Sequence, residues 1–490
     1  MRRTFLSLTG RTLAVGLTAL CVSISVEAQS LKVNMGEVTY CHAASHTGDM
    51  TFTGGKTLTI QGKTYTLADV DSINIDNTTT DDNTVSVVYN GSAAHVTVAG
   101  NLAPYLTITA KGADISIVAS ADCKEKIVYT LTGSSTNGSF YMDGEEGATL
   151  NLNSLSLTST TGGAITIDDG KKILVNVNGT NVLSDAATGA QKACLYINGH
   201  AVINGTGQLS VTGNAKHAYF SDEYTELDGP TMTVPSSASD GLHVNQYFTM
   251  KSGTVTVTDA KGDGIDVGKT KDATDKNNGC FFLNGGTISL TTTGQGTKGV
   301  KADSTITVTD GTLTVNCQSS AYYDTTDADI SSGACLKSGY ATTISGGTLN
   351  LTATGDGGKG INAGSTVTVS GGYTAVTTTG ATFVYGAYDS KPQGVKSDAD
   401  IVVNGGEIYV CASSDGGKAF STDYDFTING GTLLGIGAKK AEPTGGTQTY
   451  KTFKGQNIVG GSTVTFNGVS YTIPSIYSNS SARVVASKAN

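Results

Sequence analysis

A glycine-led phrase recurs eight times in the second half of the chain and strongly constrains its fold. Each copy is a glycine followed by apolar residues at every second position, as in Gly253-Thr-Val-Thr-Val. The copies begin at Gly229, Gly253, Gly286, Gly311, Gly347, Gly372, Gly406 and Gly431, with spacings of 24 or 25 residues or of 33 to 36 residues. A period in the twenties, with insertions of about ten residues at set places, is typical of a solenoid whose turns tolerate loops at fixed corners.

Each repeat contains three short stretches in which apolar and polar residues alternate. The first follows a second glycine, as in Gly264-Ile-Asp-Val. The second resembles Ile306-Thr-Val308, and the third is the recurring phrase itself. Alternation with a period of two indicates strands with one buried face. We therefore predict an all-β fold, a right-handed parallel β-helix with three short strands per turn and small β caps at its ends, since parallel crossovers are almost always right-handed.

The periodic region suggests a four-part organisation. Residues 1–28 read as a signal peptide, with three arginines before an apolar run and a cleavage site near Ala28. Residues 29–82 read as an N-terminal β cap or small module and residues 83–437 as the β-helix. Residues 438–490 read as a C-terminal cap followed by a loose tail from Ser478. We expect a secreted, periplasmic or cell-surface protein. Lipidation at Cys21 is disfavoured because Leu20 stands where a small residue should precede the cysteine.

Charge and cysteine content exclude several classes of function. The formal net charge is −10, and removal of residues 1–28 makes it −12, which argues against a nucleic-acid partner. No second apolar stretch is long enough to span a membrane. The seven remaining cysteines are an odd number and lack any Cys-x-x-Cys spacing, so we interpret them as small apolar core residues.

The stretch from Leu150 to Asp185 carries a family resemblance. It contains Leu-Asn-Leu at 150–152, Ala-Ile-Thr-Ile at 164–167 and Ile-Leu-Val-Asn-Val-Asn-Gly at 173–179, and Asp-Gly turns recur after it. Because these motifs follow one another in this order, residues 85–437 resemble the secreted bacterial carbohydrate-binding domains of parallel β-helix fold. Those domains are related in fold to pectate lyases. The resemblance implies non-catalytic binding of polygalacturonate-like, pectin-type polysaccharide or of cellulosic glycan, assisted by calcium.

Lysines recur at two equivalent positions of the first strand. We predict that its outward positions are the glycine, which would keep the floor low, and the residue two beyond it. Long insertions flank this strand and would wall a groove. The lysines predicted to bind the carboxylates of an acidic glycan are Lys298, Lys301, Lys337, Lys359, Lys396 and Lys418. A solvated face that keeps the protein soluble is the alternative.

Acidic and aromatic residues complete the predicted groove. Calcium prefers hard oxygen ligands, and the predicted calcium ligands are Asp240, Asp263, Asp266 and Asp303, although ordinary Asp-Gly turns would also place aspartates there. The tyrosines predicted to stack on sugar rings are Tyr322, Tyr323, Tyr385 and Tyr388.

Two other functions remain open at the level of sequence. A polysaccharide lyase would need a base, for which Lys298, Lys301 or Lys337 is available, whereas no histidine spacing indicates a triad. An exported adhesin or structural stalk would need no site at all. The long loops that border the first strand argue against the stalk. Arg483 is the sole arginine after residue 28 and lies in the tail, which excludes an arginine base, and the resemblance favours the non-catalytic binder.

Overall fold

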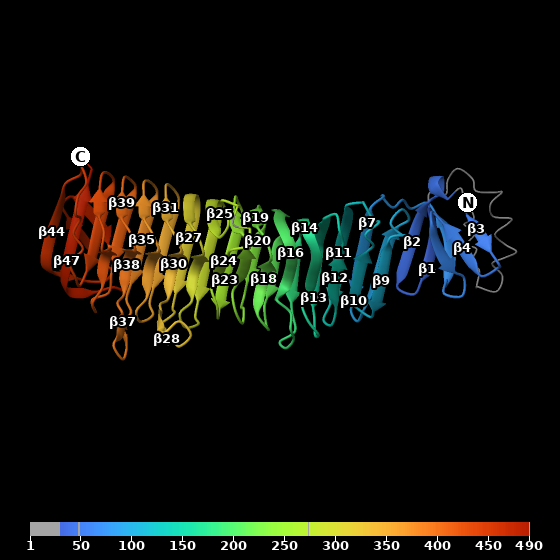
Figure 1. Ribbon diagram of the computed structural model, residues 1–490, viewed down its shortest axis with the longest axis horizontal. Helices are drawn as coiled ribbons and strands as arrows, with labels where there is room; N and C mark the ends of the chain where they lie inside the picture. The colour runs from blue at the N-terminus through green and yellow to red at the C-terminus, as the bar shows by residue number, and fades with distance from the viewer. Residues whose placement is uncertain (1–29, 48–49, 273, 490) are drawn as a thin grey trace. The chain divides into compact units, whose positions relative to one another are not determined.

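The computed structural model describes residues 30–47, 50–272 and 274–489, and these form an almost purely β structure (Figure 1). The predicted signal peptide and Cys21 lie outside the described residues. One short 3-10 turn, η1 (Ala44–His46), interrupts the strands. Within the described ranges, no helix is long and apolar enough to cross a membrane. The chain divides into two compact units, residues 1–186 with 197–200, and residues 187–196 with 201–490.

The strands up to residue 186 vary in length, and many of them pair with a neighbour in sequence. They are β1 (Ser30–Met35), β2 (Val38–Ala43), β3 (Thr51–Thr53), β4 (Thr57–Ile60), β5 (Lys63–Thr66), β6 (Ser72–Asp76), β7 (Thr84–Asn90), β8 (Ala93–Ala99), β9 (Leu106–Lys111), β10 (Asp114–Ala119), β11 (Ile127–Ser135), β12 (Ser139–Asp143), β13 (Ala148–Thr158), β14 (Ile165–Asn178) and β15 (Thr180–Ser184).

The strands of the remaining chain repeat at regular intervals. They are β16 (Ala193–Gly205), β17 (Gln208–Thr212), β18 (His217–Ser221), β19 (Thr225–Asp228), β20 (Thr231–Val234), β21 (Leu242–Asn245), β22 (Tyr247–Met250), β23 (Thr254–Ala260), β24 (Ile265–Gly268), β25 (Cys280–Thr292), β26 (Lys298–Ala302), β27 (Ile306–Cys317), β28 (Tyr322–Asp324), β29 (Asp329–Ser331), β30 (Ala334–Ser338), β31 (Thr342–Ile344), β32 (Thr348–Ala353), β33 (Lys359–Ala363), β34 (Val367–Val369), β35 (Tyr373–Thr378), β36 (Phe383–Tyr385), β37 (Tyr388–Ser390), β38 (Gln393–Ser397), β39 (Ile401–Val403), β40 (Glu407–Cys411), β41 (Lys418–Ser421), β42 (Phe426–Ile428), β43 (Thr432–Gly437), β44 (Tyr450–Ile458), β45 (Thr463–Phe466), β46 (Val469–Thr472) and β47 (Asn479–Lys488).

Thirty-eight strands belong to one sheet, and its pairing differs from the predicted fold class. The sheet closes on itself as a ring of ten parallel strands, a β-barrel in its connectivity, and the other strands lie outside the ring. The prediction of a right-handed solenoid with three separate strands per turn is wrong on this connectivity.

Long strands are the physical reason for the closure. β25 pairs with β22 through Cys280–Leu283 and with β23 through Thr287–Thr292, so it joins two ladders that the sequence suggested were separate. Two glycines, Gly285 and Gly286, lie between these segments. Gly286 takes a positive φ of 76° inside the strand, and the backbone continues with a register shift.

Burial alternates along the strands as the pattern predicted. In β32, Leu349 and Leu351 are fully buried while Asn350 between them is exposed. The seven described cysteines are buried, as expected for small core residues. At about 25 cal/mol per Å² of apolar surface removed from water, such alternating columns supply the main stabilising term.

The glycine that opens each first strand faces the interior, not the groove. A Cβ added at Gly360 would lie 2.1 Å from Val376 Cγ1, and one at Gly394 would lie 2.1 Å from Val410 Cγ1. In β30 the equivalent residue is the fully buried Cys335. Cys335 and its neighbour Leu336 are both buried, so the strict alternation of buried and exposed residues fails in this strand. The prediction of a low glycine floor for the ligand is wrong.

The two ends of the chain contain antiparallel strands. β4 pairs with β5 and β45 with β46, each as an antiparallel pair. β7 with β8 and β9 with β10 are also antiparallel, where parallel coils were expected. The predicted loose tail is instead strand β47, which pairs with β43 and β44 and buries Val484 and Val485. An uncovered β43 would expose an edge that could recruit another chain.

Candidate functional site

The predicted lysine positions lie in register along successive parallel strands. Lys301 of β26 pairs with Lys337 of β30, Lys337 with Asn362 of β33, and Asn362 with Lys396 of β38. Neighbouring strands are about 4.8 Å apart, so the four residues span about 14 Å. We call them the lysine column. Parallel pairing therefore brings together side chains that are almost 100 residues apart in sequence.

The lysines of the column differ in how far their charge is already neutralised. Lys301 Nζ lies 2.9 Å from Asp266 Oδ1 and 3.8 Å from Asp303 Oδ1. Burial opposes the charge of Lys301, but Asp266 outweighs it and raises the pKa of Lys301. Lys396 forms an ion pair with Asp398. Lys337 has no ion pair among the described residues. Burial lowers its pKa, Asp398 opposes this shift, and Lys396 and Lys298 lower the pKa further.

Two other predicted lysines, Lys298 and Lys359, hold the bases of loops. Lys298 and Lys359 both pair with Ala334, on its two sides. The Lys298 ammonium donates to Gly296 O and to Ser331 Oγ at the base of β29. Lys359 is 5% exposed, and its ammonium donates to Ser390 Oγ at 2.7 Å and to the carbonyl oxygens of Gly357 and Lys391 at 2.9 Å. Both side chains thus hold the base of a loop rather than face solvent.

The two loops that these lysines hold are β-hairpins. β28 pairs with β29 and β36 with β37, both antiparallel, and both hairpins project from the same edge of the large sheet (Figure 1). The turn of the first contains Ala328 at a φ of 52°, and that of the second contains Gly386 at 61°. A hydrogen bond of 2.8 Å between Ser332 Oγ and Ser390 Oγ joins their bases. Each hairpin leads directly into a strand that carries a lysine of the column.

Three of the four predicted tyrosines gather on these hairpins. The rings of Tyr323 and Tyr385 stack at 4.4 Å with an angle of 12°, and Tyr388 lies 5.3 Å from Tyr323. Tyr385 is 52% exposed and Tyr388 45%, so the cluster presents ring surface to solvent. Tyr322 differs, because its ring packs over Gly296 and its hydroxyl donates to Asp324. We call Tyr323, Tyr385 and Tyr388 the tyrosine cluster.

The predicted acidic residues lie at the other end of the column, together with two histidines. Asp266 pairs with Lys301 on one side and with His243 on the other. His243 Nδ1 is 2.9 Å from Asp240 Oδ2 and 3.3 Å from Asp266 Oδ2, and His217 Nδ1 is 3.1 Å from the same Asp240 oxygen. We call these four residues the histidine–aspartate cluster.

Charge within this cluster shifts several pKa values. Burial disfavours the carboxylate of Asp240, but hydrogen bonds from His217 and His243 outweigh it and lower the pKa of Asp240. Burial likewise opposes protonation of His243, whereas Asp240 and Asp266 raise its pKa to about 9. Asp263 has no histidine against it; burial, reinforced by Asp240 and Asp266, raises its pKa to about 7.

The predicted calcium ligands do not form a set that suits calcium. Asp263 Oδ1 accepts the Lys298 backbone N–H, while Asp266 holds the Lys301 ammonium. Asp303 is near this ammonium and half exposed. Calcium requires six to eight oxygens, whereas imidazole nitrogens and an ammonium already face these carboxylates. Calcium at this cluster stays a prediction of the sequence, and no step below depends on it.

His217 was missed by the sequence analysis although a signal for it exists. β18 pairs with β21 such that Tyr219 faces Leu242, which places His217 one strand before Asp240 in the same column. The preceding repeat has Ala218 where the later repeats have glycine, so the column seemed to begin at Asp240. Extending it by one repeat would have found the second histidine.

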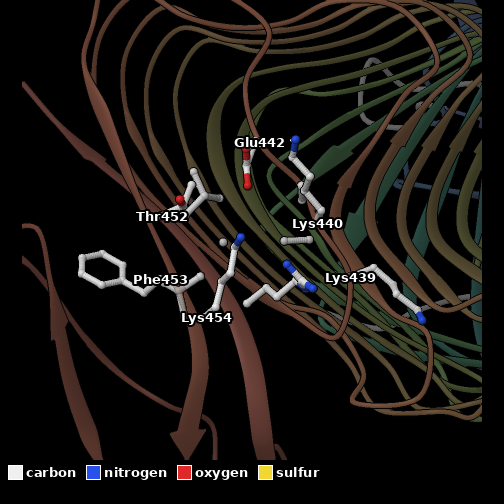
Figure 2. A pocket seen from close by; sticks show the side chains of 12 residues that line it. Lys439, Lys440, Glu442, Thr452, Phe453 and Lys454 are labelled. Atoms are coloured by element: carbon white, nitrogen blue, oxygen red, sulfur yellow. Dashed lines mark ion pairs between the residues drawn. The ribbon is translucent and has the colours of Figure 1, made fainter.

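Lys418 lies in line with Lys298 and Lys359, since it pairs with Gln393, which pairs with Lys359. It lines a pocket of about 150 Å³ together with Phe420, Tyr424 and Lys440. Next to it is a smaller pocket lined by Lys439, Lys440, Lys454 and Arg483, in which Lys440 forms a 3.1 Å ion pair with Glu442 (Figure 2). These cations are exposed and far along the chain from the tyrosine hairpins.

The structure thus combines a large parallel sheet, a line of in-register cations and a cluster of exposed tyrosines. A family model described as carbohydrate-binding domain-containing protein matches residues 104–382, which is more than half of the chain. The chain belongs to this carbohydrate-binding domain-containing family. Carbohydrate is therefore the supported class of partner.

Two further comparisons complete this finding. The structure of the polysaccharide lyase-like protein from C. thermocellum, in its gadolinium derivative, is 20% identical and covers 55% of this chain and 96% of its own, with a TM-score of 0.42. A likeness of this size supports no statement about function. No curated protein matches the chain.

Proposed function

We propose that the chain binds an acidic, polygalacturonate-like polysaccharide without cleaving it. The lysine column would face the carboxylates, and the tyrosine cluster would stack against sugar rings. The observation that carries this proposal is the register of Lys301, Lys337 and Lys396 along one line of parallel strands. The secretory signal predicted in residues 1–28 would place the protein where such polysaccharide occurs.

Lys337 is the central residue of this proposal. It is half-buried and has no ion pair among the residues that the structure describes, whereas the lysines on either side each have a carboxylate. A cation that is partly removed from water and has no counter-ion gains most from an external carboxylate. Asn362, the next residue of the column, can add amide hydrogen bonds to hydroxyl groups.

Neutralising the column should weaken binding to polygalacturonate. We expect the triple variant Lys301→Gln, Lys337→Gln and Lys396→Gln to lose at least about tenfold in affinity, or about 1.4 kcal/mol, measured by calorimetry at low salt. The matched control replaces Lys439, Lys440 and Lys454 with glutamine, which removes the same charge elsewhere. Equal losses in the two triple variants would show that net charge, not the column, governs binding.

Removing an exposed ring should have a smaller effect on the same affinity. We expect Tyr385→Ala to lose about three- to tenfold, because one ring contact contributes about 0.5–1.5 kcal/mol beyond its buried area. Tyr424→Ala is the control, since Tyr424 is 63% exposed and lies outside the hairpins. A Tyr385→Ala variant that binds like the parent protein would exclude the tyrosine cluster from the site.

A polysaccharide lyase is the second candidate, and Lys337 is the observation in its favour. Burial lowers the pKa of Lys337, as a catalytic base requires, whereas Asp266 raises that of Lys301. Incubation with polygalacturonate distinguishes the two functions. A lyase would generate unsaturated product with ultraviolet absorbance, and that absorbance would disappear in Lys337→Gln; the binder would generate none.

A further inference from the structure

We propose that His217, Asp240 and His243 bind one transition-metal ion of the Zn²⁺ type, with Asp266 as the fourth ligand. The first three residues offer ligand atoms that lie within 4.8 Å of one another. The site lies in the unit formed by residues 187–196 and 201–490 and comes from three successive strands or their entry turns, β18, β21 and β24. The proposal does not depend on glycan binding.

The atoms of the cluster converge in a way that ordinary turn chemistry does not require. Asp240 Oδ2 has His217 Nδ1 at 3.1 Å and His243 Nδ1 at 2.9 Å, and Asp266 Oδ2 lies 3.3 Å from His243 Nδ1. In a tetrahedral site with metal–ligand distances of about 2.0–2.1 Å, neighbouring ligand atoms are roughly 3.3 Å apart. The observed separations are close to this value. A small contraction would bring His217, Asp240 and His243 onto one ion, and Asp266 Oδ2 would approach it from the side of His243.

The other oxygen of each carboxylate is already held by the protein. Asp240 Oδ1 accepts the backbone N–H of Asp263 at 2.8 Å, and Asp266 Oδ1 accepts the Lys301 ammonium at 2.9 Å. Each carboxylate therefore directs its Oδ2 toward the histidines. Such outer contacts orient metal ligands and commonly change metal affinity 10- to 100-fold.

The two imidazole rings are also oriented by packing. Their centroids lie 4.7 Å apart, and Phe220 meets His243 edge to face at 4.6 Å. The Asp240 backbone nitrogen also lies 3.3 Å from His217 Nδ1, so this ring nitrogen has two neighbouring atoms on Asp240. His217 is 4% exposed, whereas the side chain of His243 is 22% exposed, so an ion can reach the cluster from the side of His243.

The donor types select the class of ion. Two imidazole nitrogens with two carboxylate oxygens suit Zn²⁺, Co²⁺ or Ni²⁺, whereas calcium takes oxygen ligands in larger number. The Lys301 ammonium occupies the outer oxygen of Asp266 and leaves too few oxygens for a calcium shell. The cluster should therefore discriminate strongly against calcium.

The test measures metal binding directly on the mature chain after treatment with a chelator. We expect calorimetry to show one Zn²⁺ per chain with a Kd in the micromolar range or tighter. Co²⁺ should give the intense visible absorption bands of a tetrahedral site, and excess Ca²⁺ should displace neither ion. His243→Gln should weaken Zn²⁺ binding at least tenfold and abolish the Co²⁺ bands, with an unchanged circular dichroism spectrum.

Controls keep the result decisive. His46→Gln changes a histidine elsewhere and should keep the Zn²⁺ affinity and the Co²⁺ bands of the parent protein. If His243→Gln unfolds, Asp266→Asn replaces it and should likewise weaken Zn²⁺ binding and abolish the Co²⁺ bands. Absence of stoichiometric Zn²⁺ binding, or full Zn²⁺ affinity in the cluster variant, would overturn the proposal. Loss of polygalacturonate binding alone would not affect it.

Discussion

Gly360→Ala should lower the free energy of unfolding by about 3 kcal/mol or more. The added Cβ would lie 2.1 Å from Val376 Cγ1 and 2.5 Å from the carbonyl oxygen of Gly394 on the next strand. A side-chain methyl can rotate away, but a carbonyl paired in a parallel ladder cannot move without disturbing its neighbours. The expected cost is therefore that of overpacking a core, not of a strained turn.

Urea unfolding of the purified variant measures this effect, with the midpoint and the slope both compared. The control is Gly162→Ala, because a Cβ there meets no atom within 4 Å. Its unfolding free energy should stay within about 0.5 kcal/mol of the parent protein. If Gly360→Ala were equally harmless, the glycine would face the groove, as the sequence first suggested, and not the core.

Lys359→Met should remove a pH dependence of stability. Burial, reinforced by Lys396, lowers the pKa of Lys359 from 10.5 to about 7 in the folded protein. Between these values the unfolded chain binds more protons at this site than the folded chain does, so this site makes the protein more stable as pH rises. The gain from pH 7 to pH 9 should be about 2 kcal/mol, and Lys359→Met should lack it.

The measurement is the free energy of unfolding at the two pH values for both proteins. Lys391→Met is the matched control, since this lysine follows the same hairpin but is exposed and paired with Asp389 at 3.0 Å. Its stability should follow the parent protein at both pH values. The free energy of unfolding of the parent, minus that of Lys359→Met, should rise with pH. A difference that stayed constant or fell would show that the Lys359 ammonium is not desolvated beside β36 and β37.

Residue spacing alone predicted much of the candidate site. Lys301 and Lys396 lie two residues beyond a glycine, Lys337 lies two beyond Cys335 at the equivalent position, and parallel pairing of equivalent residues places the three on one line. The tyrosines could be assigned to insertions because they interrupt the period. Their mutual stacking could not be predicted, since it depends on how two hairpins about 60 residues apart meet.

Other parts depended on contacts that no local pattern contains. Lys298 and Lys359 look like further members of a cationic row, yet their ammonium groups find oxygen acceptors in the hairpins and turn inward. His217, by contrast, could have been found by extending the column of Asp240 by one repeat, but Ala218 stands there in place of the glycine. The C-terminal residues from Asn479 have a polar beginning, but the open edge of β43 gives them a partner.

What the sequence by itself determined is the one-sided strand and its parallel register, because alternation and repeat length act locally and identically in every copy. The tertiary structure alone decided how the sheet closes, which lysines remain available and which donor atoms converge. These outcomes depend on the direction of the backbone at glycines such as Gly286 and on acceptors supplied by distant loops. The backbone direction and the acceptors are both set by packing between segments that are far apart in the chain. The repeat pattern of the sequence does not show which of these segments meet.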